Sequence, residues 1–136
     1  MPGEAKVPSG TNPWLVVGSL SAGLAAAAGA YGWHSVNDDQ FIKDAFNVGV
    51  QYHMWHSLAL LAVAWFTQSR PQTDSGAAQA RWGARAGVLF VVGMILFSGS
   101  LYIFGITEAL PVSGLAPTGG LALIAGWVVL AFAATR

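Results

Sequence analysis

The chain contains no cysteine, and only 9% of its 136 residues are charged. The absence of cysteine excludes a disulfide framework, a thiol nucleophile and a zinc site built on thiolates. Soluble domains carry about 25% Asp, Glu, Lys and Arg, so this chain has too few charges to cover a soluble surface. Its six basic and six acidic residues cancel, and this balance gives no indication of a nucleic-acid-binding protein.

Hydrophobic residues, in contrast, make up 54% of the chain, and its mean hydropathy is +0.55. Charged clusters separate four apolar stretches, each close to the roughly 20 residues that a helix needs to cross a bilayer. The stretches cover about residues 14–33, 45–67, 86–107 and 117–134. The sequence therefore predicts an all-α membrane protein, in which residues 1–136 form one domain of four transmembrane helices in a compact antiparallel bundle.

Polar segments connect these stretches. Residues 35–44 are predicted to form an outer turn or an amphipathic interfacial helix, residues 68–85 a polar loop, and residues 108–116 the last turn. Asn12 followed by Pro13 is typical of a helix start, because Asn caps free backbone N–H groups and Pro fits the first turn.

Basic residues near the span ends predict the orientation, because cytoplasmic loops of membrane proteins are enriched in Lys and Arg. With four spans, Lys43 lies alone on one side, and the other side holds Lys6, Arg70, Arg81, Arg85 and Arg136. We therefore expect both termini in the cytoplasm. A cleaved signal peptide ending near residue 30 is an alternative for the first span, but this apolar run exceeds the roughly 7–15 residues of a signal-peptide core.

Small residues recur along the first span. One face carries Gly18, Ala22, Ala26 and Ala30 at four-residue spacing, and the adjacent face carries Ser21, Ala25 and Gly29. Small residues let membrane helices approach closely and associate through van der Waals contact. We therefore expect a tight helix contact along the first span, either within the bundle or between copies.

The conspicuous polar residues within the spans fall in the outer half of the membrane, given the predicted topology and a helix rise of about 1.5 Å per residue. Intramembrane polar groups are candidates for function, because an unpaired one is costly in lipid. The candidate ligand- or cofactor-binding residues are His34, Tyr52, His53, His56, Ser98, Ser100 and Tyr102.

Two of the histidines, His53 and His56, lie three residues apart and so share one helical face. This spacing suits two ligands of a metal ion, and His34 is placed to join them from a neighbouring helix end. Neutral imidazole binds copper, zinc and iron. The alternative is that each histidine forms a hydrogen bond to a backbone carbonyl, a serine or a tyrosine across helices. The sequence leaves both interpretations open.

An intramembrane hydrolase is a further alternative, because Ser98 and Ser100 opposite His53 or His56 resemble a nucleophile–base pair. No carboxylate within the spans orients a histidine, and no oxyanion donors are recognisable. A Ser-Gly-Ser segment in a membrane helix is typical of close packing. We therefore expect no enzymatic activity.

Four segments resemble the YgdD-like family of small bacterial inner-membrane proteins, which carry a domain of unknown function (DUF 423). They are Gly29–His34, Tyr52–Leu61, Leu96–Tyr102 and Ala116–Trp127, in the order in which the family has them. The resemblance implies a four-helix, multi-pass protein of the inner membrane and supplies no activity.

Three positions depart from that family pattern. In the segment Gly29–His34, Tyr31 stands where the family has Phe, and Trp33 stands where it has Ala. The family's Tyr-Gln-x-x-His segment corresponds to Tyr52–His56, and His53 stands where glutamine is usual. A polar role shared by the family would therefore rest on the remaining polar candidates, which are His34, His56, Ser98, Ser100 and Tyr102.

These features predict a small membrane protein that acts as an accessory or assembly subunit of a larger membrane complex, or as a homo-oligomer. Its expected partners are the lipid bilayer and either another membrane protein or further copies of the chain, and not nucleic acid. The alternative is a binding protein that holds a metal, tetrapyrrole, quinone or lipid in an outer-leaflet pocket built around His34 and His56.

Overall fold

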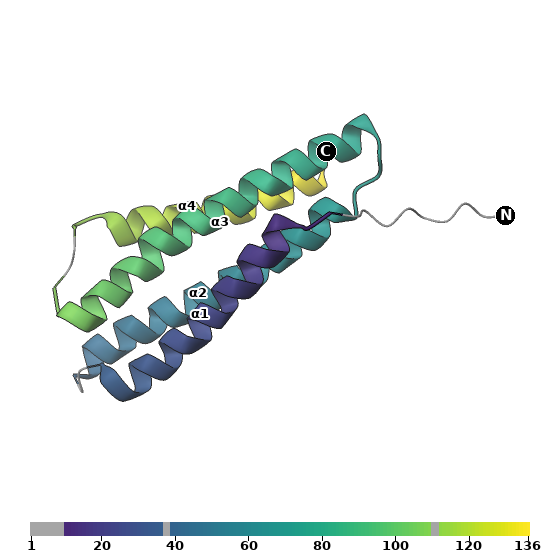
Figure 1. Ribbon diagram of the computed structural model, residues 1–136. Coiled ribbons are helices and arrows are strands. Elements are labelled where there is room, and N and C mark those ends of the chain that lie inside the picture. Colours follow the sequence, from purple (N-terminus) through teal and green to yellow (C-terminus); the bar gives the residue numbers. More distant parts are fainter. Residues whose placement is uncertain (1–9, 37–38, 110–111) are drawn as a thin grey trace.

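The computed structural model describes residues 10–36, 39–109 and 112–136. These residues form α-helices joined by short turns, so the described part of the chain has an all-α fold. The helices are α1 (Pro13–Ser35), α2 (Gln40–Gln68), α3 (Asp74–Thr107) and α4 (Leu115–Ala134). They run alternately up and down, so that the start of α1 and the end of α4 lie at the same end of the molecule (Figure 1). The predicted all-α class is confirmed. We call this end the terminal end and the other the turn end.

The helices α2 and α3 form the centre of the structure. The most extensive contacts join α1 to α2, α2 to α3 and α3 to α4. Accordingly, α2 and α3 each contribute ten buried residues, whereas α1 and α4 contribute three and four. The molecule is therefore a central helix pair with one flanking helix on each side, and each flanking helix leaves most of its surface exposed.

Helix α3 begins much earlier than expected, which corrects the predicted loop over residues 68–85. The Thr73 side chain accepts the N–H of Gly76 and so caps a helix that starts at Asp74. The added turns pack against the end of α4, where the rings of Trp82 and Phe132 lie 5.0 Å apart in an edge-on arrangement. The connection between α2 and α3 shrinks to residues 69–73.

The predicted interfacial helix over residues 35–44 is also corrected. The Asp39 carboxylate accepts the N–H groups of Phe41 and Ile42 and caps α2, so residues 40–44 form the first turn of that helix. At the other end of the molecule, the predicted cap is confirmed. Asn12 Oδ1 accepts the N–H of Trp14 at 2.9 Å, and its Nδ2 donates to the carbonyl of Ala64 on α2 at 3.1 Å.

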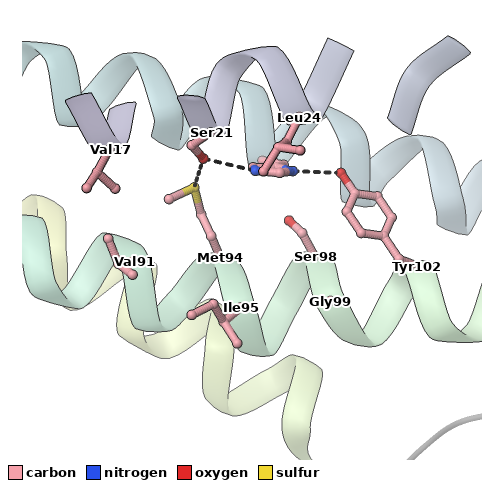
Figure 2. A pocket seen from close by; sticks show the side chains of 10 residues that line it. Val17, Ser21, Leu24, Val91, Met94, Ile95, Ser98, Gly99 and Tyr102 are labelled. Carbon is pink, nitrogen blue, oxygen red and sulfur yellow. Dashed lines mark hydrogen bonds between the residues drawn. The ribbon is translucent and has the colours of Figure 1, made fainter. Parts of the chain in front are cut away.

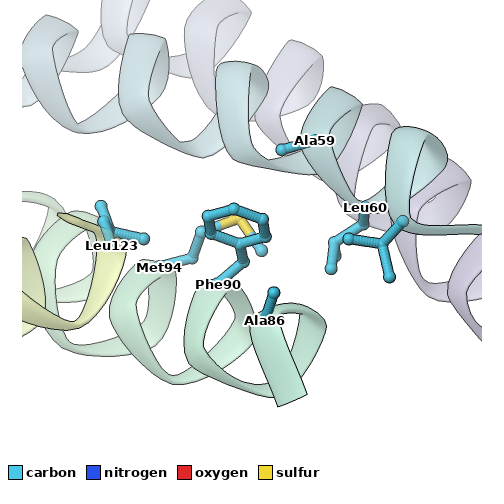
Figure 3. Packing of buried hydrophobic residues seen from close by; sticks show 7 residues of the cluster. Ala59, Leu60, Ala86, Phe90, Met94 and Leu123 are labelled. Carbon is cyan, nitrogen blue, oxygen red and sulfur yellow. The ribbon is translucent and has the colours of Figure 1, made fainter. Parts of the chain in front are cut away.

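The main hydrophobic cluster fills the space between the second half of α2, the middle of α3 and α4. It consists of Ala59, Leu60, Val63, Ala86, Phe90, Met94 and Leu123 (Figure 3). Glycine makes room for its largest members: the Phe90 ring lies against Gly126, and Leu123 against Gly93. Burying these side chains holds α4 close to α3.

The tight contact expected along α1 is made with α2, but at a different spacing. The fully buried residues of α1 are Gly18, Ala25 and Gly32, which recur every seven positions, whereas Ala26 and Ala30 of the predicted four-step run are exposed. A seven-residue repeat is the one that keeps two helices in contact when they cross at a small angle.

Three of the helices, α1, α3 and α4, are long and apolar enough to cross a membrane. With 29 residues α2 is also long enough to cross a membrane, but it is less hydrophobic than the three other helices described. Its polar side chains account for the difference, and they include Asn47, Gln51, His53 and His56.

Candidate functional site: a polar cluster beside a groove between α1 and α3

The imidazole of His53 links three helices. Its Nδ1 lies 3.0 Å from the hydroxyl of Tyr102 on α3, and its Nε2 lies 2.9 Å from Oγ of Ser21 on α1 (Figure 2). Because His53 itself belongs to α2, a single side chain fixes the relative positions of α1, α2 and α3.

Ser57 sets the direction of every proton in this cluster. Its Oγ donates to the carbonyl oxygen of His53 at 2.7 Å, because a carbonyl can only accept. Ser21, 2.7 Å away, then donates to Ser57 in preference to the weakly accepting sulfur of Met94 at 3.9 Å. With its proton used in this way, Ser21 accepts from His53 Nε2. The remaining Nδ1 of a neutral imidazole has no proton, so it accepts the hydroxyl of Tyr102. For a neutral imidazole, the network therefore places the proton of His53 on Nε2.

An apolar groove runs alongside this cluster, between α1 and α3. Its volume is about 380 Å³, and it is lined by Val17, Ser21, Leu24, His53, Val91, Met94, Ile95, Ser98, Gly99 and Tyr102 (Figure 2). Leu24 and Ile95 stand on its rim, 66% exposed each. Because these rim side chains lie on the outer surface of α1 and α3, the groove opens onto the surface that the helices present to lipid.

The hydroxyl of Ser98 is the unusual group in this groove. The side chain is only 1% exposed, and its Oγ is the buried side-chain N or O atom that has no hydrogen-bond partner in the described part of the chain. In Figure 2 it points away from α3, into the space between Met94 and Tyr102. A buried hydroxyl without a partner costs about 1–3 kcal/mol, so this atom is expected to have one when the protein functions.

His56 points in a different direction from α2, towards α4. Its Nδ1 donates to the carbonyl of Tyr52 at 2.8 Å, and its Nε2 accepts the indole N–H of Trp127 on α4 at 3.2 Å. An indole can only donate, so both ring nitrogens of His56 are occupied. This histidine joins α2 to α4 and has no free lone pair for a metal.

The three histidines thus do not form the predicted metal site, which corrects that expectation. His34 is exposed at the end of α1, and the described residues contain no group of three His, Asp or Glu side chains able to hold a metal. His53 and His56 diverge because a spacing of three residues leaves about 60° between side chains on a helix. That angle directs one towards α1 and α3 and the other towards α4. The alternative, hydrogen bonds to a tyrosine and to a backbone carbonyl, is what the structure has.

The other predicted site residues separate in the same way. Tyr52 stacks on His56 with ring centres 5.9 Å apart and also packs on Phe97. Ser100 Oγ donates to the carbonyl of Leu96 on its own helix. Of the predicted set, the structure therefore brings together His53, Ser98 and Tyr102.

Sequence reasoning missed Ser21 and Ser57 as parts of this cluster. The depth of a residue along its predicted helix could have indicated Ser21, because Ser21 and His53 lie at similar depths in the membrane. The spacing of small residues along the first span instead placed Ser21 on a packing face. The contact of Ser21 with His53 also differs from the pair a serine hydrolase needs, because Nε2 carries the proton and donates it. Among the described residues, neither Ser98 nor Ser100 forms a hydrogen bond to a histidine.

Long apolar helices, an exposed apolar surface and a hydrogen-bonded polar cluster enclosed by three helices define a helical membrane protein. Residues 25–120 match the family described as "Protein of unknown function (DUF423)", and the chain belongs to this family. The predicted family membership is thereby confirmed.

Named relatives extend the match over almost the whole chain. The UPF0382 membrane protein YwdK of Bacillus subtilis is 34% identical over 126 residues, covering 90% of this chain and 96% of the relative. The UPF0382 inner membrane protein YgdD of Escherichia coli is 27% identical over 124 residues, covering 90% and 88%. No solved structure matches the chain significantly. The chain is a multi-pass protein of the bacterial inner membrane, as the sequence predicted.

Proposed function

We propose that all four helices span the membrane and that both termini lie in the cytoplasm. Helix α2 packs between α1 and α3, so it crosses the bilayer with them, and its histidines are hydrogen-bonded to neighbouring groups. The terminal end carries Arg70, Arg81, Arg85 and Arg136, and the turn end carries Lys43. The excess of basic residues supports a cytoplasmic terminal end.

Single cysteines test this topology, because the chain has none of its own. Gln72→Cys and Ser113→Cys place a thiol at exposed positions of opposite ends. We expect a membrane-impermeant maleimide to label Ser113→Cys in intact spheroplasts and to label Gln72→Cys only after lysis. The reverse pattern would show an inverted protein, and labelling of both variants before lysis would contradict the four-span topology.

We further propose that the protein binds a lipid-like molecule, which enters the groove between α1 and α3 from the bilayer. The observation that carries this proposal is the buried hydroxyl of Ser98, which lines the groove without a hydrogen-bond partner. The apolar walls suit a hydrocarbon chain, and the polar groups are few and gathered near Ser98. A largely apolar cavity with a few convergent polar groups is the usual form of a small-molecule site.

The hydrogen bonds around the groove favour this class over the other ligands considered. A metal or a tetrapyrrole iron needs a free imidazole lone pair, but His53 Nδ1 accepts from Tyr102 and His56 Nε2 accepts from Trp127. A lipid or a quinone needs no coordinating nitrogen and can satisfy Ser98 through an oxygen atom.

Filling the groove tests the binding function. A Cβ added at Gly99, which lines the groove, meets no atom within 4 Å, and the same is true of Gly23, which does not line it. We expect native mass spectrometry of protein extracted in mild detergent to detect a bound molecule in the wild type and in Gly23→Leu, and at least a tenfold lower occupancy in Gly99→Leu. An empty wild type, or equal occupancy in both variants, would contradict the proposal.

An accessory or assembly role is the second candidate. It is favoured by α1, which packs on α2 and leaves an opposite face of small residues exposed, comprising Ser19, Gly23, Ala26, Ala27 and Ala30. Small residues allow a further helix to approach closely. The same mass spectra test this role, because a stoichiometric protein partner or a second copy would appear as a larger complex, whereas a monomer from native membranes would count against it.

A further inference from the structure

The polar end of the groove offers one donor and one acceptor. The Ser98 hydroxyl has a proton to give, because it has no hydrogen-bond partner among the described residues. The Tyr102 hydroxyl already donates its hydrogen bond to His53 Nδ1, because this nitrogen carries no proton when the proton of a neutral His53 is on Nε2. The Tyr102 oxygen, on a residue that lines the groove, therefore keeps lone pairs with which it can accept. This complementarity depends on the proton order that Ser57 and Ser21 impose on His53.

The two groups lie on the same face of α3. Ser98 and Tyr102 are four residues apart on α3, a spacing that puts side chains on one face with Cβ atoms about 5–6 Å apart, and both line the same groove. An oxygen between them can accept from Ser98 and, if it carries a proton, donate to Tyr102. Asp, Glu, Lys and Arg are absent from the described lining of the groove, so a charged head group would find no counter-charge there.

We infer that the groove selects a neutral lipid with a hydroxyl head group, a long-chain alcohol, whose oxygen bonds both Ser98 and Tyr102; this inference rests on the proposed binding function. The hydrocarbon chain lies along α3 past Met94 and Val91, over a groove length of about 16 Å at the ordinary helix rise. A ketone or an ether oxygen satisfies Ser98 but has no proton for Tyr102, so it binds with one hydrogen bond fewer.

Matched photoreactive probes test this selectivity. The protein is reconstituted in phosphatidylcholine nanodiscs, since this lipid has no hydroxyl group, and labelled with dodecanol, dodecyl methyl ether or dodecane that each carry the same chain diazirine. Mass spectrometry then measures the probe fraction at which labelling around the groove is half-maximal. One hydrogen bond corresponds to about a fivefold change in affinity, so we expect dodecanol to bind about fivefold more tightly than the ether, and the ether about fivefold more tightly than dodecane.

Three variants assign the two bonds. Tyr102→Phe is expected to weaken dodecanol about fivefold and leave the ether unchanged, whereas Ser98→Ala is expected to weaken both about fivefold. Ser100→Ala is the matched control: it removes the same hydroxyl from the same helix, but Ser100 donates to its own backbone and does not line the groove. The unchanged affinity of the ether for Tyr102→Phe also shows that this variant is folded.

The possible results distinguish a failure of the hydroxyl selectivity from a failure of the proposed binding of a lipid-like molecule. Equal affinity of dodecanol and the ether for the wild type would overturn the hydroxyl selectivity, while a loss of both in Ser98→Ala would still support a binding groove. Saturable labelling by none of the probes would overturn both proposals.

Discussion

Replacing Gly119 by alanine is expected to lower the free energy of unfolding by about 3 kcal/mol, the upper part of the ordinary range for overpacking a core. A Cβ at this position would overlap the backbone nitrogen of Phe97 and lie 2.9 Å from the carbonyl carbon of Leu96. These atoms belong to the backbone of α3 and cannot rotate away, so α4 would have to move off α3. Denaturation in mixed micelles, followed by far-UV circular dichroism, measures the loss.

The adjacent glycine supplies the control for this prediction. A Cβ at Gly120 would meet the Phe97 ring at 3.7 Å, an ordinary van der Waals distance. We expect Gly120→Ala to leave stability unchanged or raise it by up to about 1 kcal/mol, because alanine has the higher helix propensity. Equal losses in the two variants would mean that α3 and α4 do not approach each other at Gly119.

His53→Leu is expected to cost about 2 kcal/mol, the second largest effect. It leaves the Tyr102 hydroxyl without its acceptor, and a buried group without a partner costs about 1–3 kcal/mol. Ser21 loses the bond from His53 but keeps its bond to Ser57. Hydrogen bonds between membrane helices contribute about 0.6 kcal/mol on average, which keeps the expected total at the low end. The same denaturation experiment measures it.

Two further variants check the cause of that loss. His34→Leu makes the same substitution at an exposed histidine, where a change within about 0.5 kcal/mol is expected. Adding Tyr102→Phe to His53→Leu removes the unsatisfied hydroxyl, so the double variant should be less destabilised than the sum of the single ones. Strict additivity would show that the hydrogen bond between His53 and Tyr102 contributes nothing to stability.

Local sequence signals predicted the helices well where capping and apolar length agree. Asn12 before Pro13 marked the start of α1, and long apolar runs marked α1, α3 and α4. The start of α3 was missed because Arg81 and Arg85 made residues 68–85 resemble a soluble loop. In the structure Arg85 lies over the Trp82 ring at 4.2 Å, and Trp82 packs on Phe132 of α4, a stabilising contact between residues about 50 positions apart in the sequence.

The candidate site was predicted in composition but not in arrangement. Depth along the helices correctly indicated that polar side chains gather at similar heights, and His53 and Tyr102 do meet. Depth does not give the direction in which a side chain points around its helix. His53 and His56 therefore appeared to belong to one site, although His53 turns towards α1 and α3, and His56 turns towards Trp127 on α4.

The sequence by itself determined that this chain is an all-helical membrane protein of the DUF423 family, because length, apolarity and capping are properties of contiguous residues. Tertiary structure alone decided which polar groups are satisfied and which is not. The groups that bond His53 are Ser21 on α1, Ser57 on α2 and Tyr102 on α3. The directions in which these side chains point from their helices place the proton of a neutral His53 on Nε2. The same packing encloses the Ser98 hydroxyl without a partner beside an open groove, which no spacing within one segment could have indicated.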